Sequence, residues 1–310
     1  MSFSEIVPCN YCGSTDFSVK YPSTLNGLDK LELSHFRCTS SSYGLHPQIV
    51  TCTNCGLVYT NPRYQSDLVI ESYQAVNDPT YEQERDGRLI TFRRNLLPLS
   101  AMLGATNEPR RLIDIGAHIG TLVEVANELG WDAMGVEPSR WAAERGQERG
   151  LKILSTTLRD AKFDAATFDA VTIWDVIEHL SDPYAELQEM ERVLKPGGVL
   201  AIHTIDIDSL TSHLMGTRWP WLMEMHQYYF TPRTLGAMVE KAGLEIEQVT
   251  YQGRYLRLQY LVTRIAPYSK SLARMMDVII TRAGLRAVAV PVNFFDLFTL
   301  FARKPYRLSE

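Results

Sequence analysis

Apolar and polar positions follow a strand-then-helix rhythm from residue 111 onward. Short apolar runs, which predict buried strands, cover residues 111–116, 131–138, 151–156, 168–180 (where the strand runs into a loop), 199–206, 244–252 and 293–305. Between them, apolar residues recur at helical spacing in residues 121–130, 140–150, 182–198 and 231–244. Such alternation is typical of a mainly parallel sheet covered by helices on both faces. We therefore predict an α/β fold with a seven-stranded, mostly parallel sheet.

The segment before this region predicts a helix. Residues 80–105 place apolar side chains such as Leu89, Phe92 and Leu96 at helical spacing. Pro98 is expected to interrupt that helix, because proline has no amide proton to donate.

All five cysteines lie in the first 55 residues, and four of them form two Cys-x-x-Cys-Gly motifs. The pairs are Cys9 with Cys12 and Cys52 with Cys55, and the glycine after each pair favours the tight turn of a metal knuckle. Four thiolates are a ligand set of structural zinc. A disulfide framework is the alternative, which the lack of an apolar run in the first ten residues disfavours. We expect Cys38 to be a free thiol.

These patterns divide the chain into three parts. We predict a zinc ribbon over 1–75, a helical linker over 76–110, and an α/β domain over 111–310 that carries a basic helical insert at about 255–290. The zinc would be structural, because four cysteines leave no ligand position open.

Charge is spread unevenly along the chain. The net charge is −5, whereas residues 254–307 carry ten Lys and Arg against two Asp and Glu, which gives +8. The overall acidity disfavours a nucleic-acid partner. We expect the basic segment to pack as a lid or a dimer contact, or else to contact an anionic acceptor or a membrane. No apolar run reaches the length of a membrane helix, so we expect a cytoplasmic protein.

Three strand ends carry groups suited to a nucleotide-like ligand. Asp114, Gly116 and Gly120 form a loop in which the backbone can approach a ligand, and the next helix offers free amides. Glu137 ends the second strand, where a carboxylate can accept hydrogen bonds from ribose hydroxyls. Asp175 ends the fourth strand. Because ligands bind beyond the carboxyl ends of parallel strands, we expect these groups to surround one site.

The ordered segments LIDIGAHIG, GVEPS, FDAVTIWDVIEHL and LKPGG resemble those of class I S-adenosylmethionine-dependent methyltransferases, over about residues 111–250. More narrowly, they are similar to the small-molecule group that includes ubiquinone-pathway and sugar methyltransferases. The ribbon resembles the leader of sugar methyltransferases from surface-glycan and antibiotic clusters. A dinucleotide dehydrogenase is the rival for the glycine loop, but it would need a third glycine to open the helix.

The resemblance implies roles for particular residues. The cofactor S-adenosyl-L-methionine would be bound by Asp114, Gly116, Ala117, His118, Gly120, Glu137, Pro138, Leu158, Asp175 and Val176. Acceptor contacts would come from Arg218, Trp219, Tyr228 and Tyr229. His179 and His226 would be the catalytic bases, because a methylated hydroxyl loses a proton that a neutral imidazole can take. A structural role for His179, and a packed aromatic core around residues 216–232, are the alternatives.

His118 departs from the family's loop, which has glycine at this position. A residue with a β-carbon needs an unusual backbone angle there, which histidine tolerates better than β-branched residues. We favour a side chain turned away toward the helices. The alternative is a wall or hydrogen-bond donor beside the amino-acid end of the cofactor.

The sequence thus predicts methyl transfer from S-adenosylmethionine to a small-molecule acceptor. Our first expectation is a hydroxyl of a sugar or glycan precursor in polysaccharide biosynthesis. Two alternatives stay open: an RNA methyltransferase whose zinc ribbon recognises RNA, and a non-catalytic glycan-binding relative. The first 62 residues contain only three Lys and Arg, which disfavours RNA recognition by the ribbon.

Overall fold

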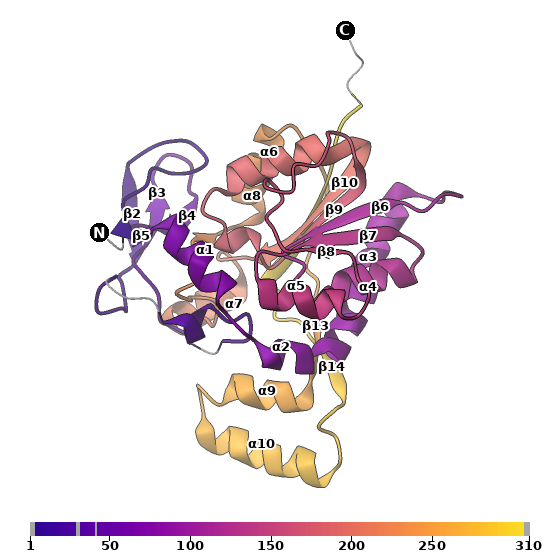
Figure 1. Ribbon diagram of the computed structural model, residues 1–310. Helices are drawn as coiled ribbons and strands as arrows, with labels where there is room; N and C mark the ends of the chain where they lie inside the picture. The colour runs from indigo at the N-terminus through magenta and orange to yellow at the C-terminus, as the bar shows by residue number, and fades with distance from the viewer. Residues whose placement is uncertain (1–3, 29–31, 41, 307–310) are drawn as a thin grey trace.

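A seven-stranded sheet forms the centre of the computed structural model, which describes residues 4–28, 32–40 and 42–306 (Figure 1). Its strands are β6 (Arg111–Ile115), β7 (Asp132–Val136), β8 (Ile153–Leu154), β9 (Phe168–Trp174), β10 (Leu194–Ile205), β12 (Glu245–Thr250) and β15 (Leu297–Arg303). They are ordered β12-β15-β10-β9-β6-β7-β8, and β15 runs antiparallel to both its neighbours. The other pairs are parallel. The predicted seven-stranded, mostly parallel sheet is therefore confirmed.

Helices cover both faces of this sheet. Successive residues of a strand point to opposite faces, so each central strand contacts helices on both sides. Leu112 of β6 is buried in a cluster with α3 (Arg85–Leu103) and α4 (Thr121–Glu128). Its neighbour Ile113 is buried with α6 (Pro183–Val193) and α8 (Pro232–Lys241) on the other face. The helix α5 (Arg140–Gln147) joins the first cluster through Ala143. This is the two-sided packing that the strand–helix alternation predicts.

Helix α3 runs through Pro98 without interruption, so the predicted break there was wrong. Leu96 and Leu99, on either side of the proline, are both fully buried in the cluster beneath the sheet. Each such side chain contributes roughly 1.5–3 kcal/mol by burial. Together they offset the roughly 3 kcal/mol that an interior proline costs a helix.

The sheet of the ribbon includes one strand from the α/β domain. Its order is β11-β4-β3-β2, made of β2 (Phe17–Tyr21), β3 (Ile49–Cys52), β4 (Val58–Thr60) and β11 (Tyr228–Tyr229). In the β11–β4 pair, Tyr228 lies opposite Tyr59 and Tyr229 opposite Val58. The shorter strands β1 (Ser4–Glu5) and β5 (Arg63–Tyr64) pair beside this sheet. The ribbon and the α/β domain therefore share a hydrogen-bonded sheet.

Several short helices connect the ribbon to α3, and others lie in or beside residues 216–232, the segment with the predicted acceptor contacts. They are η1 (Leu33–Phe36), α1 (Ser66–Gln74), α2 (Pro79–Gln83), η2 (Ile177–His179), α7 (Leu210–Met215) and η3 (Gly216–Arg218). The predicted insert consists of α9 (Leu258–Ile265) and α10 (Lys270–Arg282). A two-stranded stalk that the sequence did not predict, β13 (Arg254–Arg257) paired with β14 (Ala289–Val292), carries the two helices. Across the described ranges, every helix is too short or too polar to cross a bilayer.

Candidate active site

One large cavity lies at the carboxyl ends of the central strands. Its volume is about 840 Å³, which lies within the range of small-molecule sites, about 300–1,000 Å³. Its walls come from α1, α2 and α3, from the ends of β6, β7 and β9, from residues 211–227, and from the insert with its stalk. The ribbon contributes Phe36, Cys38, Ser40 and Tyr43. All three predicted parts of the chain therefore enclose the same space.

The glycine loop adopts the backbone that its spacing predicts. Gly116 and Gly120 have φ angles of 69° and 79°, in the left-handed region that favours glycine. A β-carbon on Gly116 would lie 2.4 Å from a methyl group of Val176, and one on Gly120 would lie 2.7 Å from Leu151. The tight packing of this loop against the sheet ends therefore requires glycine at both positions.

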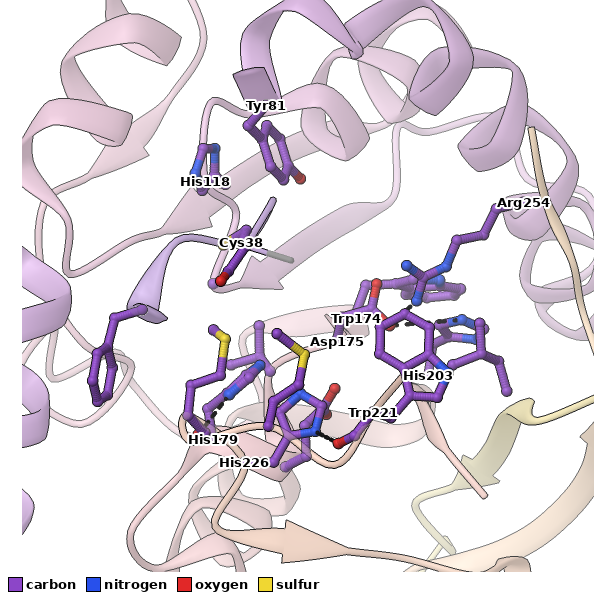
Figure 2. A pocket seen from close by; sticks show the side chains of 18 of the residues that line it. Cys38, Tyr81, His118, Trp174, Asp175, His179, His203, Trp221, His226 and Arg254 are labelled. Atoms are coloured by element: carbon purple, nitrogen blue, oxygen red, sulfur yellow. Dashed lines mark hydrogen bonds and ion pairs between the residues drawn. The ribbon is translucent and has the colours of Figure 1, made fainter. Parts of the chain in front are cut away.

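His118 occupies the loop with φ 48°, which confirms the unusual backbone angle expected there. Its side chain is not turned away, as we had favoured, but forms part of the cavity wall. The imidazole stacks on Tyr81, with ring centroids 3.6 Å apart at 28° (Figure 2). Burial lowers the pKa of His118 to about 3, so the ring is neutral at physiological pH.

Two carboxyl groups lie beneath the loop, and one of them bonds to its backbone. The backbone N–H of His118 donates to Glu137 Oε2 (2.8 Å), and that of Ser139 donates to Oε1 (2.7 Å). The Tyr73 hydroxyl also hydrogen-bonds to this carboxylate. Asp114 accepts a hydrogen bond from the Thr172 hydroxyl (2.7 Å). Burial raises the pKa of both carboxyl groups to about 7.

The predicted cofactor residues therefore fall into two layers. Those that border the cavity are Gly116, His118, Pro138, Leu158, Asp175 and Val176. Those that lie beneath its surface are Asp114, Ala117, Gly120 and Glu137. The second layer shapes the loop, and Glu137 is fully buried with its oxygens already engaged.

A cationic group that sequence reasoning missed lies beside the loop. The Arg88 guanidinium of α3 stacks over the Tyr81 ring, 3.6 Å from its centroid, and borders the cavity. Its Nε is buried and unpartnered. Among the described residues no carboxylate forms an ion pair with Arg88. Because Tyr81 lies in α2 and Arg88 in α3, spacing along a single helix does not predict their contact.

The two predicted bases lie together at another part of the cavity (Figure 2). The rings of His179 and His226 are 4.7 Å apart between centroids. Their Nδ1 atoms lie 3.0 Å from the Met225 carbonyl and 2.8 Å from the Trp221 carbonyl, respectively. A carbonyl only accepts, so each Nδ1 carries the proton and each Nε2 is a free base. Burial lowers the pKa of both imidazoles.

A carboxyl group joins these imidazoles. One donor atom each from Glu178, His179 and His226 all lie within 4.8 Å of one another. Burial and the neighbouring Asp175 raise the pKa of Glu178 to about 8. Two imidazoles and a carboxylate are a donor set that could hold a divalent cation, as well as a proton-accepting pair.

Asp175 organises a polar corner between these two regions. Its backbone lies in the left-handed region, with φ 56°, and its carboxylate accepts from Arg254 of the stalk (2.5 Å). The Arg254 guanidinium lies over the Trp221 ring, 5.4 Å from the centroid. His203 stacks on Trp174, with centroids 5.6 Å apart, and its buried Nε2 lies 3.8 Å from Asp175 Oδ1, without a hydrogen-bond partner among the described residues. Sequence reasoning did not single out His203, Trp221 or Arg254.

The four residues that the sequence predicts to contact the acceptor do not line the cavity. Trp219 is buried and donates through Nε1 to Asp296 (3.0 Å), and Tyr228 and Tyr229 are buried in β11. Arg218 lies in η3 outside the cavity. Because β11 pairs with the ribbon strand β4, the side chains of Tyr228 and Tyr229 are packed in the hydrophobic core. Trp221, two residues after Trp219, is the aromatic residue of this stretch that faces the cavity.

The four paired cysteines meet at one point. Cys9 and Cys55 have their Sγ atoms 3.5 Å apart, as do Cys12 and Cys52, and all four sulfurs lie within 4.8 Å of one another. All four are free thiols. A tetrahedron of zinc–sulfur bonds of about 2.3 Å has edges of about 3.8 Å, so the cluster fits one zinc ion. Cys38 instead borders the cavity, and it is solvent-exposed.

Known proteins are similar to the α/β part of this chain. A model of the family described as "Methyltransferase domain" matches residues 81–249, more than half of the 310 residues. A ubiquinone biosynthesis O-methyltransferase of Cereibacter sphaeroides is 33% identical over 148 residues, covering 44% of this chain and 60% of the relative. That of Dinoroseobacter shibae is 28% identical, covering 51% of this chain and 73% of the relative. The chain thus spans about three fifths of the first relative's length.

Two solved structures share part of the chain path at low identity. A SAM-dependent methyltransferase from Archaeoglobus fulgidus aligns with a TM-score of 0.48 at 19% identity, covering 73% of this chain and all of that chain. Phosphoethanolamine N-methyltransferase 2 of Haemonchus contortus, in complex with S-adenosyl-L-methionine, gives a TM-score of 0.44 at 19% identity, covering 68% of this chain and 52% of that chain.

Proposed function

Because the chain belongs to the family of methyltransferase domains, we propose that it transfers a methyl group from S-adenosylmethionine to a hydroxyl of a small-molecule acceptor. The relatives matched over part of their length are named O-methyltransferases. The observation that carries the proposal is the cavity itself, which joins a glycine loop and a cation without a counter-ion to a pair of neutral imidazoles.

Arg88 would hold the carboxylate of the cofactor. The guanidinium is half-buried, and its Nε is enclosed and unpartnered. Enclosing such a group without a counter-ion is costly, and a carboxylate with good geometry offsets that cost. The guanidinium lies in one stack with Tyr81 and His118, directly beside the glycine loop. The amino-acid end of the cofactor would therefore lie between α3 and the loop. When bound, the cofactor supplies a methyl group already activated by its sulfonium.

The adenosine end would lie against Pro138, Leu158 and Val176, which border the cavity beyond the loop. Glu137 remains our proposed partner for the ribose, with one condition that the structure adds. Its carboxylate is fully buried, so the side chains that cover it must shift before a ribose hydroxyl can reach one of its oxygens.

His179 or His226 would accept the acceptor's proton as the methyl group is transferred. Both have a free Nε2, and backbone carbonyls fix their tautomers. A lowered pKa keeps them neutral, which is the state that a base requires at neutral pH. The remaining task of the chain is to align the acceptor with the methyl group and exclude water.

The cavity lining favours an acceptor with an apolar body. Side chains such as Phe36, Ile70, Met223, Met225 and Leu261 line it, and apolar walls with a few polar groups fix orientation through those groups. The relatives' name, ubiquinone biosynthesis O-methyltransferase, is consistent with such an acceptor. A sugar or glycan hydroxyl is the second candidate, which the faces of Trp221 and Tyr268 in the same lining favour, because aromatic faces pack against sugar rings.

We also propose that the four-cysteine cluster holds one structural zinc ion. RNA as an acceptor and a purely glycan-binding role remain the alternatives. A mass-resolved product screen decides among these possibilities: the purified chain is incubated with S-adenosylmethionine and separate pools of phenols, nucleotide-sugars and RNA. A mass gain of one methyl group in a small-molecule pool supports the proposal, whereas methylated RNA, or binding of glycans without turnover in any pool, contradicts it.

A further inference from the structure

The insert carries an apolar stripe that faces solvent. Leu272, Met275, Val278 and Ile279 of α10 are 42%, 55%, 44% and 56% exposed. Their spacing of three and four residues places them along one side of the helix. The buried residues of α10 lie on the other side, and α10 packs against α9. In Figure 1 α10 is the outermost element of the insert, with α9 between it and the rest of the molecule.

Unpaired basic residues accompany this stripe. Lys270, Arg274 and Arg282 form no ion pair with any residue in the described ranges. Asp277, the one acidic residue of α10, is bonded to Arg286 (3.0 Å). Positive charge beside a continuous apolar stripe is the pattern of helices that lie in the interfacial region of a membrane.

We propose that α10 docks on the surface of a membrane containing anionic lipids, with its apolar stripe among the headgroups. Charge favours this occupant over a second copy of the chain. In a two-fold dimer through the same face, the unpaired cations of one copy would meet those of the other, and like charges repel. Anionic headgroups complement these cations instead, at about 1 kcal/mol for each basic residue near the surface.

Docking through α10 brings the cavity close to the lipid headgroups. Tyr260, Leu261 and Ile265 of α9 border the cavity, and packed helices lie about 8–10 Å apart. Tyr268, in the turn between the two helices, also borders the cavity and is 48% exposed. An acceptor dissolved in the membrane, or anchored to it, would thus lie near the site. The docking itself does not depend on the proposed methyl transfer.

Co-sedimentation with vesicles tests the proposal. We expect the full chain to bind vesicles of phosphatidylcholine with phosphatidylglycerol, to bind pure phosphatidylcholine much more weakly, and to dissociate as salt is raised. The double variant Met275→Glu/Ile279→Glu should lose at least about tenfold in partitioning, since it places charges in the apolar stripe. Arg274→Gln/Arg282→Gln should lose roughly 30-fold, about fivefold for each cation. Leu97→Glu, at a 60% exposed position of α3, is the matched control and should bind as wild type.

Three results would overturn the proposal: no binding to either vesicle, binding that the α10 variants leave unchanged, or a dimer in solution that Met275→Glu/Ile279→Glu converts to a monomer. The last result would assign the face to a second copy. Titration of each variant with S-adenosylhomocysteine separates this question from the proposed function. Wild-type affinity for that ligand in a variant that no longer binds vesicles shows an intact fold and a lost docking face.

Discussion

The two sides of the cavity are built in different ways. The centre of the cofactor side is a short continuous loop, in which Gly116, His118 and Gly120 set the backbone through their own φ angles. The acceptor side is assembled from the ribbon, from residues 211–227 and from the insert, which are far apart in the sequence. The centre of the first side is set by local backbone geometry, whereas the second depends in part on the pairing of β11 with the ribbon strand β4. Disturbing the ribbon should therefore affect the two sides unequally.

The β11–β4 pairing shows how the ribbon contributes to the acceptor side of the cavity. His226 lies two residues before β11, and the backbone N–H of Gln227 donates to the Glu178 carbonyl (2.8 Å). The ribbon therefore holds the segment that carries one proposed base against the segment that carries the other.

The largest effect is expected from Cys52→Ser, which removes one of the four clustered thiolates. Metal analysis should find about one zinc per wild-type chain and much less in the variant. Structural zinc supplies several kcal/mol of folding free energy, so a loss of about 4 kcal/mol should lower the melting temperature by roughly 8 °C or more. Cys38→Ser is the control and should keep the metal. Equal metal content in both variants would refute the four-thiolate site.

The next effect tests the cofactor side alone. Arg88→Gln should weaken binding of S-adenosylhomocysteine by roughly 10- to 150-fold, which corresponds to about 1.5–3 kcal/mol for a hydrogen bond between charged groups. Equilibrium dialysis measures this. Arg93→Gln, on the same helix but 49% exposed and paired with Glu128, is the matched control. If both variants bind like wild type, the carboxylate of the ligand lies elsewhere.

The third effect concerns the acceptor side and its pH dependence. A base with a lowered pKa stays neutral until the pH falls below that pKa, so kcat should stay level through pH 7 and fall only below about 6.5. His179→Ala or His226→Ala should lower kcat by about 10²–10⁴-fold while leaving affinity for S-adenosylhomocysteine unchanged. A rate that falls already above pH 7, or that a chelator abolishes while the protein stays folded and keeps the zinc of its cysteine cluster, would argue for metal binding by Glu178 and the two histidines instead.

The smallest effect is expected from His118→Gly. The variant loses a ring stack with Tyr81 worth about 0.5–1.5 kcal/mol, but it relieves a positive backbone angle. We expect affinity for S-adenosylhomocysteine within about tenfold of wild type, or ~1.4 kcal/mol. Fluorescence titration can resolve this. Binding that disappears altogether would make the imidazole itself a cofactor ligand.

The difference between the two sides of the cavity also explains which features could be predicted from the sequence. The sheet, the glycine loop and the cysteine pairs follow from spacing, because each depends on neighbouring residues. The insert's stalk and the burial of Trp219 and Tyr228 depend on pairing with distant strands, which spacing does not record. Arg88 was missed because it is one of four arginines in α3, and the enclosure of its Nε becomes visible only when the cavity is formed.

Calorimetric titration of the wild-type chain with S-adenosylhomocysteine tests the central claim most directly. The claim is that the cavity between the glycine loop and Arg88 binds this class of cofactor. We predict saturable binding with one site per chain, in protein that retains its zinc. No binding by folded, zinc-loaded protein would contradict the account, whichever acceptor the chain uses.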